Sequence, residues 1–136
     1  MASIRKADYY TMKVSQRPGA GAMLLGAMKK AGVNLLAFHG FPEGGGAQVD
    51  FMPENSVKFR RAAKKKGLRV SKRKTVFLVR GADRVGALTR ILGKLAAKKI
   101  NLVALSAVTA GSRRYGMIFW VRPKDIGRTS RVLRAR

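Results

Sequence analysis

The sequence predicts an α+β protein built from two copies of one βαββαβ unit, and three observations support this class. The chain has 136 residues, and 46% of them are hydrophobic, which is enough apolar material for a folded core. Strand-like and helix-like patterns follow one another in the order strand, helix, strand, strand, helix, strand. The segment from Arg17 to Phe38 then recurs, without a gap, from Arg84 to Leu105.

The recurrence extends beyond hydrophobicity, because identical residues occupy matched positions. RPGAGAMLLGAMKKAGVNLLAF in the first copy aligns with RVGALTRILGKLAAKKINLVAL in the second. Identical pairs include Arg17 with Arg84, Gly19 with Gly86, Ala20 with Ala87, Gly26 with Gly93, Asn34 with Asn101 and Leu35 with Leu102. We therefore predict two domains, residues 1–73 and residues 74–136, with the boundary near Arg73.

The first copy opens with a strand in which apolar and polar residues alternate, and Pro18 and Gly19 end it. An apolar stripe at helical spacing then predicts a helix of about three turns before Gly32. A glycine-rich turn between two further strand patterns predicts a hairpin, and Pro53 precedes a second amphipathic stretch. We expect strands over residues 10–15, 34–41, 47–52 and 68–71, with helices ending at Gly32 and Gly67.

The second copy repeats this order. Strands are expected over residues 75–80, 100–109 and 114–121, and helices over residues 87–98 and 124–135. It stops before its last strand. Residues 102–108 are apolar at nearly every position, which predicts that other parts of the protein cover both faces of that strand.

This order of elements predicts a ferredoxin-like fold repeated twice, with antiparallel sheets and the helices of each copy on one face. A unit of about 65 residues buries little surface alone, so pairing of copies or of chains is expected. The missing last strand would leave an open sheet edge, and we expect a homodimer to cover it.

Composition excludes several kinds of chemistry. The chain has no cysteine, and His39 is its one histidine, so disulfides, thiol catalysis, cysteine-type zinc sites and multi-histidine metal sites are excluded. Six acidic residues show no motif spacing typical of general acid–base catalysis. The glycines after Pro18 also lack the G-x-G-x-x-G dinucleotide fingerprint. We expect no enzyme activity, no cofactor and no metal.

No apolar run approaches the ~20 residues of a membrane-spanning helix, and the N-terminus lacks the apolar stretch of a signal peptide. We therefore expect a cytoplasmic protein without a membrane span.

The two turns between strand and helix are the best candidates for a binding site. The first N–H groups of a helix are unpaired donors with partial positive charge, so these turns suit a small carboxylate. Gly19 and Gly86 would let a ligand approach, and Asn34 and Asn101 could offer side-chain amides. A purely structural role also fits, in which the glycines shape tight turns and the asparagines cap the helix exits.

The two repeated segments, which we call the signature segments, each have a D-R-P-G-like turn followed by an amphipathic helix that ends near A-G-V-N or K-K-I-N. Both resemble the ACT-domain signature. The whole chain is therefore similar to a tandem ACT-domain protein. ACT domains are regulatory modules that bind small molecules, usually amino acids, between the turn of one unit and the second strand of a neighbour. The resemblance implicates Arg17, Pro18, Gly19, Ala20, Asn34 and Leu35, and Asp83, Arg84, Gly86, Ala87, Leu88, Asn101 and Leu102.

The sequence departs from the ACT pattern at four positions in these segments. Gln16 stands where the family prefers aspartate, Gly21 where it prefers leucine, Val85 where it has proline and Lys99 where it has glycine. Asp83 precedes a predicted helix, where an aspartate is most often an N-cap.

The charge leaves a second class of function open, because 30 basic and 6 acidic residues give a net charge of +24. Basic runs around residues 60–66 and 72–74 could neutralise phosphates, or could form a solvated surface. Tyr115, Phe119 and Trp120 lie in an alternating strand but miss the register of the RNA-recognition motif, so we expect them in the core. We thus expect a regulatory protein that binds a small carboxylate, with nucleic-acid binding as the alternative.

Overall fold

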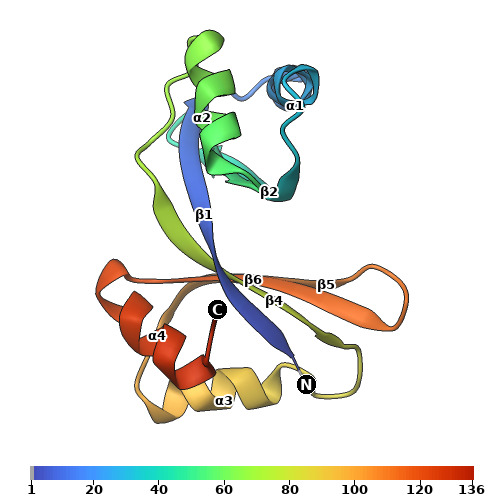
Figure 1. The fold of residues 1–136 in the computed structure, drawn as a ribbon, viewed down its shortest axis with the longest axis vertical. Coiled ribbons are helices and arrows are strands. Elements are labelled where there is room, and N and C mark those ends of the chain that lie inside the picture. The colour runs from blue at the N-terminus through green and yellow to red at the C-terminus, as the bar shows by residue number, and fades with distance from the viewer. Residues whose placement is uncertain (1) are drawn as a thin grey trace. The chain divides into compact units, whose positions relative to one another are not determined.

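The computed structural model describes residues 2–136 and has the predicted α+β architecture (Figure 1). Its strands and helices follow the order strand, helix, strand, strand, helix in each copy, and neither copy has a last strand of its own. They are β1 (Ser3–Val14), α1 (Ala20–Lys30), β2 (Leu35–Glu43), β3 (Gly46–Pro53), α2 (Ser56–Lys65), β4 (Lys74–Ala82), α3 (Thr89–Ala97), β5 (Leu102–Thr109), β6 (Arg114–Val121), a 3₁₀ turn (Pro123–Asp125) and α4 (Ile126–Leu133).

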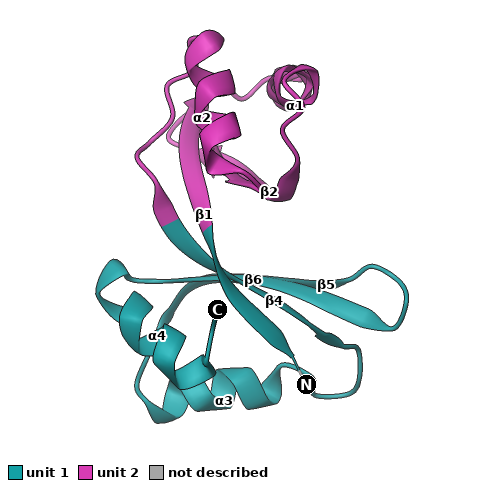
Figure 2. Cartoon of the chain, viewed as in Figure 1, with its two compact units in different colours: residues 1–7, 75–136 teal, residues 8–74 magenta. Residues whose placement is uncertain are grey.

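The chain divides into two compact units (Figure 2). Unit 2 is Asp8–Lys74 and holds the first sequence copy, while unit 1 joins residues 1–7 to Thr75–Arg136 and holds the second. The units therefore differ from the expected division at residue 73 chiefly in residues 1–7, which group with the second copy. Whether either unit is an independently folding domain stays a prediction.

Unit 2 has three antiparallel strands in the order β2–β3–β1, covered by α1 and α2. Tyr10 on β1 lies opposite Phe51 on β3, and Phe51 lies opposite Phe38 on β2. Phe59 of α2 packs on both central rings, at 4.9 Å from Tyr10 and 5.2 Å from Phe51 between ring centroids. Leu24 and Met28 of α1 join the same core, so both helices lie on one face of these strands.

Unit 1 repeats this arrangement with strands in the order β1–β4–β6–β5, where β1 contributes residues 3–7. Phe77 on β4 lies opposite Phe119 on β6, with the rings stacked 5.1 Å apart. Leu95 of α3 and Leu133 of α4 pack into the same core, and both helices lie on one side of the strands in Figure 1.

The second copy lacks its own last strand, but the edge beside β4 is not open. Residues 3–7 of β1 occupy the position next to β4. The last residue of the chain also bonds to this part of β1, because Lys6 N donates to Arg136 O at 3.0 Å and Arg136 N donates to Ile4 O at 3.0 Å. The expectation of an open edge beside β4 is wrong, because residues 3–7 take the place of the missing last strand.

Two further strand expectations need correction. Residues 102–108 were expected to be covered on both faces, yet β5 is an edge strand of the sheet. It is exposed beyond Leu102, with Val103 at 63% and Val108 at 67% exposure. Residues 68–71 form no regular strand. They follow β1 more loosely, with Ser71 N donating to Thr11 O at 2.9 Å.

The helices of both copies end in one backbone arrangement. In α1, Val33 N donates to Met28 O and Gly32 N to Lys29 O, both at 3.0 Å. The last bonds of α2, α3 and α4 follow the same pattern, which is the Schellman motif and needs a left-handed residue after the helix. That residue is Gly32, Gly67, Lys99 or Arg134, with φ of 71°, 69°, 57° and 55°.

Candidate functional site

The two strand-to-helix turns have matching backbones. Ala20 N donates to Arg17 O at 3.3 Å in the first, and Ala87 N donates to Arg84 O at 3.1 Å in the second. Gly19 and Gly86 both have positive φ, 89° and 72°. A side chain at either position would be strained by that conformation, although the space around a Cβ at Gly19 is empty. The glycines are thus required by the backbone, and they also leave the first turn accessible.

The start of α1 offers free hydrogen-bond donors. Gly19 is the N-cap and provides no side-chain acceptor, and the first turn contains no acidic residue. Ala20 N is used within the turn and Met23 N donates to Gly19 O at 2.9 Å. Within residues 2–136 the N–H groups of Gly21 and Ala22 have no hydrogen-bond acceptor. These two donors lie at the positive end of the α1 dipole.

A pocket of about 230 Å³ adjoins this turn. One wall is the turn itself, including Arg17 and Gly21, and the other is the hairpin of β2 and β3, including Phe41. No acidic side chain is among the residues that line it, which are Val14, Ser15, Gln16, Arg17, Ala20, Gly21, Gly40, Phe41, Pro42, Ala47 and Val49. The pocket therefore places Arg17 and Gly21, one of the two residues with a free N–H donor, beside an apolar wall, which suits a small molecule that carries an anionic group.

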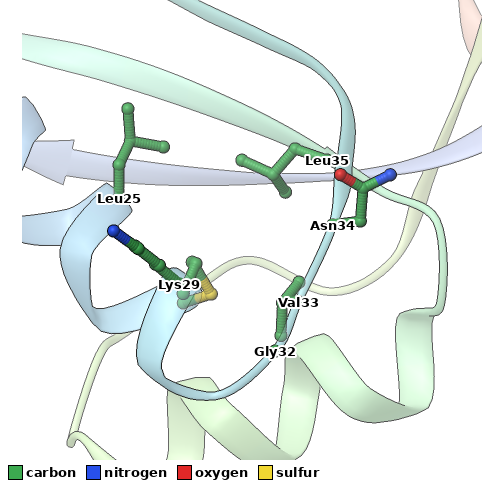
Figure 3. A pocket seen from close by; sticks show the side chains of 7 residues that line it. Leu25, Lys29, Gly32, Val33, Asn34 and Leu35 are labelled. Atoms are coloured by element: carbon green, nitrogen blue, oxygen red, sulfur yellow. The ribbon is translucent and has the colours of Figure 1, made fainter.

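A second, more open hollow of about 430 Å³ lies at the other end of α1 (Figure 3). Figure 3 shows Leu25 and Lys29 coming from α1, Asn34 from the segment that leads into β2, and Leu35 from the first position of β2. The backbone carbonyl of Asn34 accepts a bond from Glu54 N at 2.9 Å. The side-chain amide of Asn34 is exposed and has no partner within residues 2–136, so it is available to a ligand.

The six candidate residues of the first copy are therefore divided between two places. Arg17 and Ala20 line the pocket at the start of α1, with Pro18 and Gly19 in the same turn, whereas Asn34 and Leu35 line the hollow at its end. The eleven residues of α1 separate the two sets by about 16 Å at 1.5 Å per residue. One small ligand cannot contact both sets within unit 2.

The second turn departs from the first in where its helix begins. The helix expected from Ala87 begins at Thr89, because Thr89 N donates to Gly86 O at 3.0 Å and this second tight turn delays regular α-helical bonding. The expectation that Asp83 is the N-cap is wrong, since the N-cap is Leu88 and Asp83 uses its backbone N–H to bond Arg113 O at 2.9 Å.

The remaining candidates of the second copy follow the same division as those of the first. Asp83, Arg84 and Gly86 are exposed in the turn, and Ala87 and Leu88 pack partly on the core of unit 1. Asn101 is exposed and Leu102 half-buried at the far end of α3. The turn and the start of β5 therefore do not converge on one ligand within unit 1.

Sequence reasoning missed the hairpin wall of the pocket, formed by Gly40, Phe41, Pro42 and Ala47. No local sequence pattern marks this wall, because it depends on strand register: Val14, the last residue of β1, pairs with Ala47 near the start of β3. An antiparallel hairpin must therefore turn beside the start of α1. Gln16 and Gly21, identified only as departures from the ACT pattern, also line this pocket.

Other candidate chemistries gain no support from the geometry. Tyr115, Phe119 and Trp120 are buried, as expected for core residues, so they present no stacking surface. Within residues 2–136 no three His, Asp or Glu side chains lie close enough together to hold a metal ion. No helix in that part of the chain is long and apolar enough to cross a membrane.

Solved structures share this fold over nearly the whole chain. Protein BT0572 from Bacteroides thetaiotaomicron is 17% identical, with a TM-score of 0.77 and coverage of 98% of this chain and 88% of that one. The ligand-free regulatory subunit of aspartate kinase from Thermus thermophilus is 11% identical, with a TM-score of 0.64 and coverage of 98% and 94%. Clostridium acetobutylicum aspartate kinase is 13% identical, with a TM-score of 0.52 and coverage of 97% and 33%.

The chain matches no description of a known protein family and no curated protein. The structural likeness nonetheless confirms the tandem ACT-type fold to which the two signature segments pointed.

Proposed function

We propose that this chain is a non-catalytic regulatory protein that binds a small carboxylate ligand, an amino acid in the first instance, beside the first strand-to-helix turn. The observation that carries the proposal is the pair of free N–H donors at Gly21 and Ala22, next to Arg17 and a pocket without acidic lining. Regulatory subunits of aspartate kinase share the fold, which supports a regulatory role.

The mechanism follows from the chemistry of the pocket. The ligand carboxylate accepts hydrogen bonds from the first turn of α1 and is attracted by its dipole and by Arg17. Phe41, exposed at 37% on the hairpin, supplies an apolar wall for the ligand side chain. Ligand binding then favours the conformation in which the turn and the neighbouring surface that completes the site are both ordered. This shift in population is the regulatory signal.

Asn34 and Leu35 enter the proposal as the contribution of a neighbouring unit or chain. Since α1 separates them from the turn of their own copy, they can complete only a site whose turn comes from elsewhere. The same division holds in the second copy. The proposed binding residues are thus Arg17, Pro18, Gly19 and Ala20 with Asp83, Arg84, Gly86, Ala87 and Leu88 from the turns, and Asn34, Leu35, Asn101 and Leu102 from the second strands.

We also propose that the protein is a homodimer, for a different reason from the one expected. The edge beside β4 is filled by residues 3–7, but β5 is a terminal strand with an apolar, exposed sequence. Such an edge offers unpaired backbone groups to another strand.

Sedimentation velocity at tens of micromolar should give a dimer, and Val103→Lys should convert it to a monomer. Met23→Lys, at an exposed position of α1, should not. A wild-type monomer at that concentration would refute this proposal.

The binding proposal is tested by a thermal-shift panel of the twenty amino acids at moderate salt. A ligand at about 100 times its dissociation constant should add roughly 2.7 kcal/mol of stability, which moves the melting temperature by several degrees. We expect one amino acid, or a few related ones, to produce this shift. The absence of a shift with all twenty would contradict the amino-acid proposal.

Two variants with the same charge change locate the site. Gly21→Asp places a carboxylate in the pocket and at a helix N-terminus, so it should weaken ligand binding at least tenfold without loss of fold stability. Met23→Asp is exposed on the same helix and does not line the pocket, so binding should stay within about twofold. Equal loss in both variants would place the ligand elsewhere.

A further inference from the structure

The densest run of basic residues in the chain forms most of α2, its connection to β4 and the first residue of β4. Between residues 57 and 74 there are ten basic residues and no acidic one, namely Lys58, Arg60, Arg61, Lys64, Lys65, Lys66, Arg69, Lys72, Arg73 and Lys74. All belong to unit 2, and all except Lys74 are exposed. We call residues 57–74 the basic segment.

The fold sorts this segment into a buried apolar side and an exposed cationic side. Phe59, Ala62 and Ala63 are buried at 0–7% exposure and anchor α2 to the core. Arg60 and Lys64, and likewise Arg61 and Lys65, are four residues apart, so each pair lies on one face at a spacing of about 6 Å. The result is two parallel rows of cations along the outer side of the helix.

These cations are not neutralised within the protein. The side chains of Arg60, Arg61, Lys64 and Lys65 have no hydrogen-bond or ion-pair partner within residues 2–136. The ion pairs among residues 2–136 involve other cations, because Asp125 pairs with Arg122 and Arg128, and Glu43 with Lys13. Like charges four apart in a helix are destabilising, so α2 carries a cost that a bound polyanion would remove.

We propose that the basic segment binds the phosphate backbone of double-stranded nucleic acid. Each strand of a duplex presents a phosphate about every 3.4 Å along its axis, so two rows of cations can contact several phosphates at once. Residues 57–74 contain no Asn, Gln, Asp or Glu, and contacts of Lys and Arg with phosphates carry no sequence information, which predicts binding independent of sequence. This activity is separate from the proposed ligand site.

The same surface fits other polyanions less well. A membrane-surface helix needs an exposed apolar face, but apart from Val57 at 56% exposure the apolar residues of α2 are buried. Single-stranded nucleic acid is held largely by stacking on aromatic rings, and the one aromatic residue of the segment, Phe59, is fully buried. An acidic protein partner would be unusual, because the centres of protein interfaces are depleted in Lys.

The test measures binding of the full chain to a short duplex of arbitrary sequence by fluorescence anisotropy at several salt concentrations. For about five phosphate contacts, the slope of log K against log salt should be near −4 to −5. Lys64→Gln/Lys65→Gln should make that slope shallower by about 2 and weaken binding at least tenfold at moderate salt. Lys94→Gln/Lys98→Gln on and beside α3 removes the same charge from unit 1 and should leave the slope unchanged.

Each outcome decides the proposal once thermal melts confirm that both variants are folded. Equal losses in the two variants would mean that net charge alone drives binding and would overturn the assignment to the basic segment. A salt slope near zero would overturn phosphate binding. Tighter binding to a single strand of equal length, or to vesicles with anionic headgroups, would replace the duplex with that partner.

Discussion

The helix ends of the two copies share one backbone but differ in the residues that adopt it. In unit 2 the left-handed position after each helix is a glycine, Gly32 or Gly67, whereas in unit 1 it is Lys99 or Arg134. The bonds that close the helices are the same in both units, at 2.9–3.3 Å. The comparison teaches that the two copies keep the left-handed backbone at their helix ends even where the glycine that favours this conformation is replaced by Lys or Arg.

The turns before α1 and α3 show the opposite relation. There both copies keep glycine, with φ of 89° and 72°, yet the helices that follow begin two matched positions apart. Pro18 fixes the backbone just before Gly19, and Val85 imposes no such restriction before Gly86. The glycine that both copies share therefore secures the turn, whereas the residue before it affects where regular helix begins.

The largest expected effect comes from the turn glycines. Gly19→Val and Gly86→Val each force a β-branched residue into positive φ and should cost about 2 kcal/mol of unfolding free energy. Gly26→Val is the matched control, because Gly26 is also repeated but lies inside α1 with open space around its Cβ position. Denaturant unfolding of the three variants measures this, and an equal loss in all three would remove the special role of the turns.

Glycines at the helix ends should matter about half as much. Gly32→Ala and Gly67→Ala place a Cβ on a left-handed residue and should each lose about 1 kcal/mol. The space at Gly67 is open, while at Gly32 the nearest atom to a new Cβ is Lys58 Nζ at 3.2 Å, which is the mobile end of a side chain. Denaturant midpoints that do not change would show that these helix ends are not held in the left-handed form.

The reverse substitutions should stabilise unit 1. Lys99→Gly and Arg134→Gly relieve the left-handed strain but lose a cation near a helix C-terminus, so a net gain of about 0.5 kcal/mol each is expected. Lys98→Gly, one residue earlier and with negative φ, should instead destabilise. A loss of stability in Lys99→Gly comparable with that in Lys98→Gly would contradict the account of these ends.

The smallest effect is electrostatic and distinguishes the two turns. Burial raises the pKa of Tyr115, while Arg84 of the second turn and Arg114 act to lower it. Arg84→Gln should therefore raise the pKa further, and Arg17→Gln in the first turn should not, as measured by ultraviolet absorbance titration. Because the raised pKa keeps Tyr115 neutral when the unfolded chain ionises, stability should fall as pH rises above about 10. Tyr115→Phe should weaken that fall.

Much of the fold could be predicted because the repeat and its patterns are local. Alternation identified the strands of the hairpins, and the glycine-bounded stripes identified α1 and α2. The start of β1 was missed because residues 3–8, SIRKAD, have no alternation, and their strand is formed by long-range pairing beside β4. Periodicity alone also could not show that apolar β5 is an exposed terminal strand.

The candidate site was predicted in part for the same reason. The turn residues Arg17 to Ala20 follow from a local motif, and they do lie beside a pocket. The hairpin wall with Phe41 depends on strand register, and the separation of Asn34 from the turn depends on the direction of α1. Neither is a property of adjacent residues.

The most direct test of the central claim is a ¹H–¹⁵N spectrum of the protein titrated with the amino acid that gives the largest thermal shift, and with its carboxamide. The account predicts that the amide signals of Gly21 and Ala22 move with the free carboxylate and not with the carboxamide. Signals of these two residues that stay in place while others shift, or equal shifts with both compounds, would contradict a carboxylate site at the start of α1.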